Sequence, residues 1–151
     1  SDLSLIAKSS YTGGPFKNTG PYPPKPEEET TYTITFSVAN TTNNISKAKL
    51  VTSLPPRVSY KNLISPKDEK LTFDAVTREL VWDIGTIPRE TGLSGAKKEI
   101  SFQVSYTPSL SEVDLIPTLV NKSTLTGHDD FANVDLRVER PIIQSGESIK
   151  E

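Results

Sequence analysis

Cysteine and methionine are both absent from this chain of 151 residues, and histidine and tryptophan occur once each. The lack of cysteine excludes disulfides, thiolate metal sites and cysteine nucleophiles. It does not exclude an extracellular location, because disulfides are needed mainly by domains that are too small to build a core. A chain of this length can bury about 68–70% of the surface that its unfolded form exposes. We therefore expect one domain that folds without a covalent crosslink.

The chain also lacks an excess of one charge. It has 17 basic and 19 acidic side chains, a net charge of −2, and the two signs are interspersed along the sequence. There is no dense cationic stripe of the kind that neutralises phosphates, so nucleic acid is not an expected partner. The same balance gives no reason to expect binding to an anionic membrane surface.

Long apolar runs are missing as well. None approaches the ~20 residues of a membrane span, so we expect no direct membrane insertion. The first residues, Ser1, Asp2 and Leu3, lack the charged and apolar regions of a signal peptide. Because methionine is absent even from position 1, we interpret the sequence as an excised fragment. If the native protein is exported, this fragment has lost its signal and any anchor.

Apolar and polar residues alternate with a period of two along most of the chain. Tyr32, Ile34, Phe36 and Val38, for example, alternate with two threonines and a serine. This pattern predicts antiparallel strands with one buried face and one face in water. β-branched and aromatic residues, which suit a half-buried pleated surface, dominate these segments. The predicted strands cover residues 3–7, 32–38, 47–54, 57–62, 70–74, 80–84, 100–106, 118–126 and 134–138.

Turn signals separate these segments, and no window shows a helical apolar stripe. Eight or nine short strands with turns between them indicate an all-β sandwich or barrel. Residues 74–78 predict a tight hairpin. Pro55 and Pro56 must interrupt strand pairing, because proline has no N–H to donate. A short helical turn is expected at residues 110–115, with Ser109 as its cap and Glu112 three residues later.

Two segments lie outside the strand pattern. Residues 13–29 contain five prolines followed by three glutamates, which predicts an extended, polyproline-like excursion rather than a strand. Residues 144–151 are polar and are predicted to form a frayed tail. The single domain is therefore expected to span residues 1–143.

Five segments, in order, resemble a widespread bacterial and archaeal surface repeat, the family called domain of unknown function 11. They are residues 30–40 (TTYTITFSVAN), 50–58 (LVTSLPPRV), 73–87 (FDAVTRELVWDIGTI), 99–104 (EISFQV) and 119–127 (LVNKSTLTG). The resemblance covers roughly residues 2–139 and implies an immunoglobulin-like antiparallel β-sandwich. It also implies a tandem module of a long secreted or envelope-anchored protein, so we expect a fragment of an exported protein that is located outside the cell or in the cell envelope. A shared sandwich does not by itself transmit function.

One cluster of candidate metal ligands is present in the sequence. Asp129 and Asp130 follow His128, with Asn133 and Asp135 nearby. Calcium takes several oxygen ligands from a loop, so Asp129 and Asp130 are candidate calcium ligands. The alternative is a solvated turn between two strands, because the spacing matches no EF-hand loop. A lone histidine cannot build a zinc site without other nitrogen or sulfur ligands.

No catalytic constellation is visible in the sequence. The serines have only one histidine to serve as their base, and no nucleophile elbow or phosphate-binding loop occurs. Trp82 could be read as a sugar-stacking platform, but it alternates with inward-facing residues and is better explained as core. We therefore expect no enzymatic activity and no cofactor apart from the candidate calcium.

A self-formed isopeptide bond is a sharper hypothesis. Some surface sandwiches that resemble this chain link a lysine of the first strand to an asparagine of a late strand with the help of a buried acid. Lys8, Asn121 and Asp83 are the candidates, and the acid would need a pKa raised by burial. By strand alternation, however, Asp83 should point away from the face that holds Trp82. Measurement of the full calculated mass, with no loss of ammonia, would contradict the bond.

Tyr11, Phe16 and Tyr22 are candidate partner-binding residues. They lie in or beside the proline-rich excursion, where extended backbone and aromatic side chains often meet partners. The alternative is that they fold back and cover an open edge of the sandwich.

The sequence leaves two functional hypotheses open. The first is a non-catalytic structural or spacer module of a surface protein whose partners are neighbouring domains. The second is an adhesin or a carbohydrate- or protein-binding module that uses residues 11–26 or the loops at one pole.

Overall fold

Strands account for nearly all of the regular structure of this protein, as the period-two pattern predicts. The structure is a computed structural model that describes residues 3–41, 43–93, 95–112, 116–146 and 148–149. Within these residues, twelve strands and one 3₁₀ helix are present. They are β1 (Leu3–Ser10), β2 (Thr30–Asn40), β3 (Ile45–Ser53), β4 (Val58–Ser65), β5 (Lys70–Phe73), β6 (Glu79–Ile87), β7 (Lys98–Tyr106), η1 (Leu110–Glu112), β8 (Thr118–Val120), β9 (Ser123–Asp129), β10 (Val134–Arg140), β11 (Ile143–Gln144) and β12 (Ser148–Ile149).

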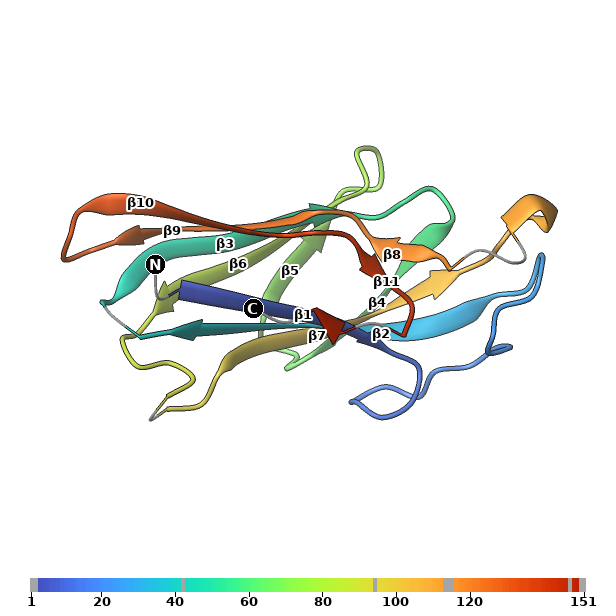
Figure 1. Ribbon diagram of the computed structural model, residues 1–151, viewed down its shortest axis with the longest axis horizontal. Helices are drawn as coiled ribbons and strands as arrows, with labels where there is room; N and C mark the ends of the chain where they lie inside the picture. Colours follow the sequence, from blue (N-terminus) through green and yellow to red (C-terminus); the bar gives the residue numbers. More distant parts are fainter. Residues whose placement is uncertain (1–2, 42, 94, 113–115, 147, 150–151) are drawn as a thin grey trace.

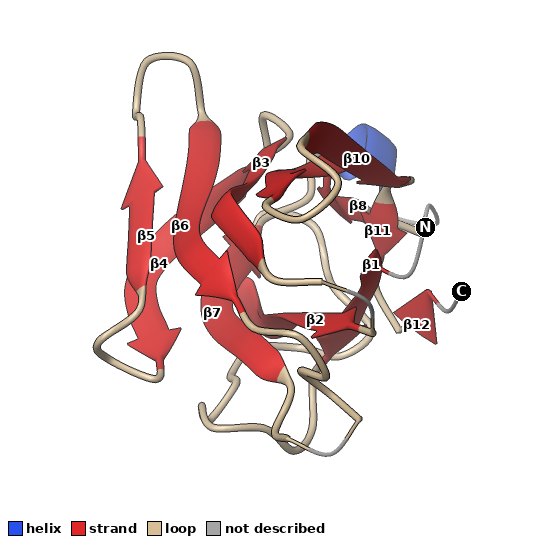
Figure 2. Cartoon of the chain, turned by 90° about the vertical axis from the view of Figure 1, so that its left-hand side faces the viewer, coloured by secondary structure: helices blue, strands red, loops and turns tan. Residues whose placement is uncertain are grey.

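Two five-stranded sheets face each other across the core (Figure 1). Sheet A has the strand order β12-β1-β2-β7-β4, and sheet B has the order β10-β9-β3-β6-β5. Strands β11 and β8 form a separate pair. The view along the strands shows the two layers enclosing one interior (Figure 2). Antiparallel sheets packed face to face form a β-sandwich, so the predicted all-β, immunoglobulin-like architecture is confirmed.

The core is made by the inward faces of the strands. Trp82 of β6 is fully buried, as its alternation with apolar neighbours predicts. Phe36 and Phe102 stack across β2 and β7 with their ring centroids 6.0 Å apart. Burial of an apolar side chain of this size stabilises the fold by about 1.5–3 kcal/mol. The apolar half of each alternating segment therefore provides most of the driving force for folding.

All nine predicted strand segments are found, but the strand count differs from the predicted eight or nine. Residues 118–126 form two strands, β8 and β9, rather than one. The break occurs where the carbonyls of Asn121 and Lys122 accept hydrogen bonds from the Thr52 hydroxyl. The predicted frayed tail is wrong for Gln144 and for residues 148–149, which pair with β8 and β1 respectively. These described parts of the tail therefore belong to the sandwich.

The prediction of a water-exposed second face is wrong for the central strands of sheet A. Polar side chains of β2 and β7 alternate with the core residues, yet they are almost fully buried on the outer face of the sheet. Alternation tells which face a residue lies on, but not whether a distant segment covers that face. These buried residues are Thr31, Thr33, Thr35, Ser37, Ser101, Gln103 and Ser105.

The predicted hairpin turn at residues 74–78 is confirmed, and the helical turn predicted at residues 110–115 is found over Leu110–Glu112, whereas residues 113–115 lie outside the described residues. At the β5–β6 hairpin, Asp74 Oδ1 accepts hydrogen bonds from the backbone N–H groups of Val76 and Thr77. At η1, the backbone N–H and the hydroxyl of Ser109 both donate to Glu112 Oε1, at 3.0 and 2.8 Å. In both places a short polar side chain satisfies backbone groups that the strands leave unpaired.

One carboxylate links the two sheets. The indole nitrogen of the buried Trp82 donates to Glu69 Oε1 at 2.8 Å, and Lys98 Nζ donates to Glu69 Oε2 at the same distance. Glu69 precedes β5 of sheet B, whereas Lys98 begins β7 of sheet A. A buried indole N–H needs an acceptor, so Glu69 allows the tryptophan to occupy the core.

Replacement of Glu69 tests this role. Glu69→Ala leaves the indole N–H without its acceptor and should lower the free energy of unfolding by about 1–3 kcal/mol. Glu69→Gln retains an acceptor oxygen and should cost less. Lys98→Ala removes only a partly exposed ion pair and should cost about 0–1 kcal/mol. Urea denaturation of the three variants measures the differences, and equal losses for Ala and Gln would contradict the role of the indole hydrogen bond.

Candidate functional site

The predicted excursion, residues 13–29, connects β1 to β2 and lies against sheet A on the side away from sheet B (Figure 1). As predicted, it forms no strand. It is not extended, however, because the backbone takes positive φ angles at Gly13 (78°), Gly14 (79°) and Gly20 (98°). These turns fold the segment back over the polar outer face of β2 and β7. The excursion therefore covers a sheet face rather than an edge.

Asn18 makes the central contacts between the excursion and the sheet. Its side-chain nitrogen donates to the Thr33 hydroxyl at 3.0 Å and to the Tyr11 carbonyl at 2.9 Å. Its side-chain oxygen accepts from Gln103 Nε2 at 3.0 Å. One amide therefore joins β2, β7 and Tyr11, the residue that follows β1. The sequence analysis missed Asn18 because a single asparagine in a loop carries no signal of a partner 85 residues away.

Further hydrogen bonds fix the rest of the excursion. Thr19 and Thr31 exchange two of them, from Thr19 N to the Thr31 hydroxyl at 2.8 Å and from Thr31 N to the Thr19 carbonyl at 2.9 Å. The Glu27 N–H donates to the carbonyl of Pro108, beyond β7, at 2.8 Å. Because both ends of the segment are bonded to the sandwich, it behaves as part of the fold.

The predicted aromatic residues divide into two groups. The rings of Tyr11 and Tyr22 stack with centroids 4.6 Å apart and an interplanar angle of 3°. Both rings meet the edge of the buried Tyr32, at 6.2 and 6.1 Å. The Tyr11 hydroxyl donates to the Gly20 carbonyl at 2.8 Å. Phe16 is half-buried and takes no part in this cluster. Of the three candidates, only Tyr22 presents a large exposed area, 52% of its surface.

Tyr32 is a structural member of this cluster. Burial, and secondarily the neighbouring Tyr22, raise the pKa of the Tyr32 hydroxyl far above its ordinary value. A phenol with such a pKa remains protonated at neutral pH. Tyr32 therefore supports the packing of Tyr11 and Tyr22 and offers no acid–base chemistry.

Asp129, a predicted calcium ligand, holds the β9–β10 turn. Its Oδ1 accepts from the backbone N–H groups of Phe131 and Ala132 at 3.0 and 2.9 Å, and its Oδ2 accepts from Asn43 Nδ2 at 3.1 Å. These bonds, that of Ala132 first, lower the pKa of the Asp129 carboxyl. The other predicted ligand, Asp130, accepts from the Ser46 hydroxyl at 2.6 Å. Both carboxylates thus have donors from the protein, and the calcium prediction gains no support from this arrangement.

His128 bridges the same hairpin. Its Nδ1 lies 2.9 Å from Asp135 Oδ1, and its Nε2 lies 2.9 Å from Asn133 Oδ1. An imidazole that faces two oxygen acceptors satisfies both only when it is protonated. The hydrogen bond to Asp135 is the largest cause that raises the pKa of His128, followed by Asn133 and by the charges of Asp135 and Asp130.

The three isopeptide candidates lie in three different places. Lys8 is exposed on the outer face of sheet A, and Asp83 is exposed on the outer face of sheet B. Asn121 follows β8, where its side-chain nitrogen donates to Ser53 Oγ at 2.9 Å. The reaction needs the three groups in contact and the acid buried. This placement therefore speaks against the isopeptide bond, and the outward direction predicted for Asp83 is confirmed.

An apolar recess of about 300 Å³ lies at the η1 end of the sandwich. Its walls include Pro55, Tyr106, Ile116 and Pro117, and Arg57 and Glu112 form an ion pair across 3.7 Å at the same place. The sequence analysis missed this recess, although its polar-end loops were a predicted binding region. The recess combines residues of the β3–β4 and β7–β8 connections, which no local pattern places together.

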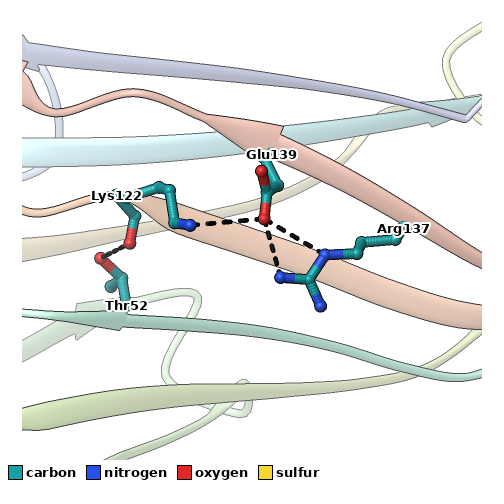
Figure 3. Close-up of polar contacts among 4 residues, drawn as sticks. All are labelled: Thr52, Lys122, Arg137 and Glu139. Carbon is teal, nitrogen blue, oxygen red and sulfur yellow. Dashed lines mark hydrogen bonds and ion pairs between the residues drawn. The ribbon is translucent and has the colours of Figure 1, made fainter.

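The outer face of sheet B carries charged and polar side chains. Glu139 of the edge strand β10 pairs with Arg137 at 2.7 Å and with Lys122 at 3.5 Å (Figure 3). The Lys122 carbonyl in turn accepts a hydrogen bond from Thr52. Charged side chains on an edge strand oppose pairing with another sheet, so we assign this face and edge a protective role.

No metal or membrane-spanning element is apparent within the described residues. No group of three or more His, Cys, Asp or Glu side chains there is placed to hold a metal ion. None of the helical segments there has the length and apolar character that a membrane crossing requires.

Comparison with known proteins adds information on the fold. No family model matches the chain, and no curated protein matches it. The resemblance to domain of unknown function 11 therefore stays a prediction.

Two solved structures have a similar fold. One is a variant of BcpA, the major pilin subunit of Bacillus cereus, with a TM-score of 0.52 and 11% identity over 95% of this chain and 40% of that chain. The other is the full-length major pilin SpaD from Corynebacterium diphtheriae, with a TM-score of 0.51 and 13% identity over 91% of this chain and 33% of that chain. The chain thus spans less than half the length of each. Identities this low show a shared fold and nothing more.

Gly20 provides a test of the covering excursion. A Cβ at this position would lie 2.1 Å from the Glu29 carbonyl oxygen, and φ is +98°. Gly20→Ala should therefore detach the excursion and expose the amides of β2 and β7 to hydrogen exchange. Gly13→Ala is the matched control, because φ is +78° but nothing lies within 4 Å, so only backbone strain of about 1 kcal/mol is added. Equal exchange protection in both variants would contradict the covering role.

His128 predicts a dependence of stability on pH. Its pKa is raised in the folded state, so its contribution is complete below the ordinary histidine value of about 6.5. The contribution is lost as pH rises through the folded pKa. The free energy of unfolding should thus fall above about pH 6.5 in the native chain and not in His128→Gln. NMR titration gives the folded pKa directly, because the chain has one histidine. A midpoint at or below the ordinary value would contradict the two hydrogen bonds.

Proposed function

We propose that this protein is a non-catalytic structural module of a secreted or cell-surface protein, where it separates and supports neighbouring domains. The observation that carries the proposal is the double coverage of sheet A. Its inner face packs on the core, and its outer polar face is bonded to the excursion through Asn18, Thr19 and Thr31. A polar segment that spends its hydrogen bonds within the fold adds rigidity and leaves few groups for a reaction.

The surface is consistent with a spacer. Strand β10 ends sheet B with charged side chains, and β4 ends sheet A with an irregular register between Tyr60 and Ile64. Charges and register irregularities on edge strands prevent unwanted pairing between sheets. A module that stands beside others in a long protein needs this protection. The sandwich fold is shared with two major pilin subunits, which is compatible with an extracellular or envelope location.

A second candidate function is favoured by one observation. Tyr22 stacks on Tyr11, yet 52% of its surface is exposed. A rigid, half-exposed tyrosine is a common anchor for protein or glycan ligands. An adhesin or carbohydrate-binding role through residues 11–26 would therefore use Tyr22 first. Binding on a glycan array that Tyr22→Ala abolishes would favour this role, and the absence of any binding would count against it.

The structural role predicts the size and location of the native protein. An antibody raised against this chain should detect a species much longer than 151 residues in the envelope fraction or the medium. Detection by immunoblot after cell fractionation measures both properties. A species of about this length in the cytosol would overturn the proposal.

A further inference from the structure

The β9–β10 turn presents a large apolar side chain to solvent. Phe131 lies at its tip and is 86% exposed. The turn is rigid, because Asp129 accepts from the backbone N–H groups of Phe131, Ala132 and Asn133, through its carboxylate and its carbonyl. The turn uses only the backbone of residue 131, so it does not require a phenylalanine. A rigid exposed aromatic side chain is the typical anchor of a protein contact.

The opposite end of the sandwich offers a site of matching size and chemistry. The hairpin tip and η1 lie at the two ends of the long axis (Figure 1). The recess beside η1 has a volume of about 300 Å³ and an apolar lining from Pro55, Tyr106, Ile116 and Pro117. A cavity of about 150 Å³ is sufficient for benzene. The volume of the recess is therefore sufficient for a phenylalanine ring.

The charges at the two ends are complementary. Arg89 and Asp130 line the surface around Phe131. Arg57 and Glu112 lie at the recess. Among the described residues, the lining of each of these two sites thus includes one cation and one anion, and Asp130 can face Arg57 while Arg89 faces Glu112. Complementary charges at the rim of an apolar contact fix its orientation and select the partner.

We propose that Phe131 of one copy of this chain inserts into the η1 recess of a second copy, so that the modules associate head to tail. Because the two surfaces lie at opposite ends, the contact does not close on itself and can repeat along a line. This inference rests on the proposed structural function and gives it a mechanism of assembly. One ring in one recess is a small contact, so a weak association is expected, with a Kd of about 0.1–1 mM.

Sedimentation velocity across the micromolar to millimolar range tests the association. The native chain should form larger species as its concentration rises. Phe131→Ser should weaken association by about tenfold or more, as for loss of an aromatic anchor. Val76→Ser is the matched control, because Val76 is 91% exposed at a turn held by Asp74 in the same manner. A native chain that stays monomeric, or an equal effect of the two substitutions, would overturn the proposal.

A mixing experiment tests the head-to-tail geometry. Phe131→Ser keeps an intact recess, and Ile116→Lys, which places a charge in the recess, keeps an intact Phe131. Neither variant should associate alone, whereas the mixture should form a one-to-one complex. Backbone amide shifts of Arg57 and Val58 in labelled Phe131→Ser should then move when Ile116→Lys is added. A mixture without association would overturn the proposal, as would retention of full self-association by Ile116→Lys, since Phe131 would then use another surface.

These outcomes are separable from those of the structural role. Self-association is measured on the purified chain and does not depend on where the cell places it. An envelope protein whose purified module stays monomeric would retain the structural function and lose the head-to-tail contact. A cytosolic protein whose module associates through Phe131 would retain the contact and lose the surface role.

Discussion

The burial of a polar sheet face is the constraint on which much of this structure depends. β2 and β7 carry hydroxyl and amide groups on the outer face of sheet A, and these groups are removed from water. A buried polar group without a partner costs about 1–3 kcal/mol. Asn18 and the backbone of Thr19 supply partners for Thr31, Thr33 and Gln103. The hydroxyls of Thr35 and Ser101 bond each other at 2.8 Å. The hydrogen bonds of Asn18 and Thr19 hold the excursion in place, and they also provide partners for polar side chains of the sheet that are buried.

Short polar side chains close two hairpins of the sandwich in a similar way. Asp74 and Asp129 each accept backbone N–H groups two and three residues later, which closes the hairpins without glycine at their tips. Val76 and Phe131 are left to project from rigid turns. At the β9–β10 hairpin, His128 also forms a hydrogen bond with Asp135, and the strength of this bond depends on the protonation of the imidazole. The β9–β10 turn, at one end of the long axis, is therefore rigid (Figure 1). A rigid end suits the proposed contact between neighbouring modules.

The similarity to pilin subunits has to be weighed against these local features. A shared sandwich does not transmit function, and at identities of 11% and 13% most side chains differ. The function therefore has to be inferred from the interactions that the polar groups of this chain make. Asp129 and Asn18 spend their hydrogen bonds within the fold, and Lys8 and Asp83 lie apart on opposite outer faces. An inert module explains this distribution better than a reactive one.

Local patterns in the sequence were sufficient to predict the strands, their inward faces, the burial of Trp82 and the turn at Asp74. Each of these features follows from local periodicity or from a side chain that bonds its own backbone. Three features became visible only in the folded structure. The outer face of sheet A is covered, Asn18 bonds Gln103, and residues 118–126 form two strands. The structure also shows that the carboxylate of Asp129, a predicted calcium ligand, accepts hydrogen bonds from the turn backbone and from Asn43. These features depend on contacts between residues that are far apart in the chain. Local periodicity does not indicate which distant residues will be in contact. The same holds for the recess beside η1, which two separate connections form together.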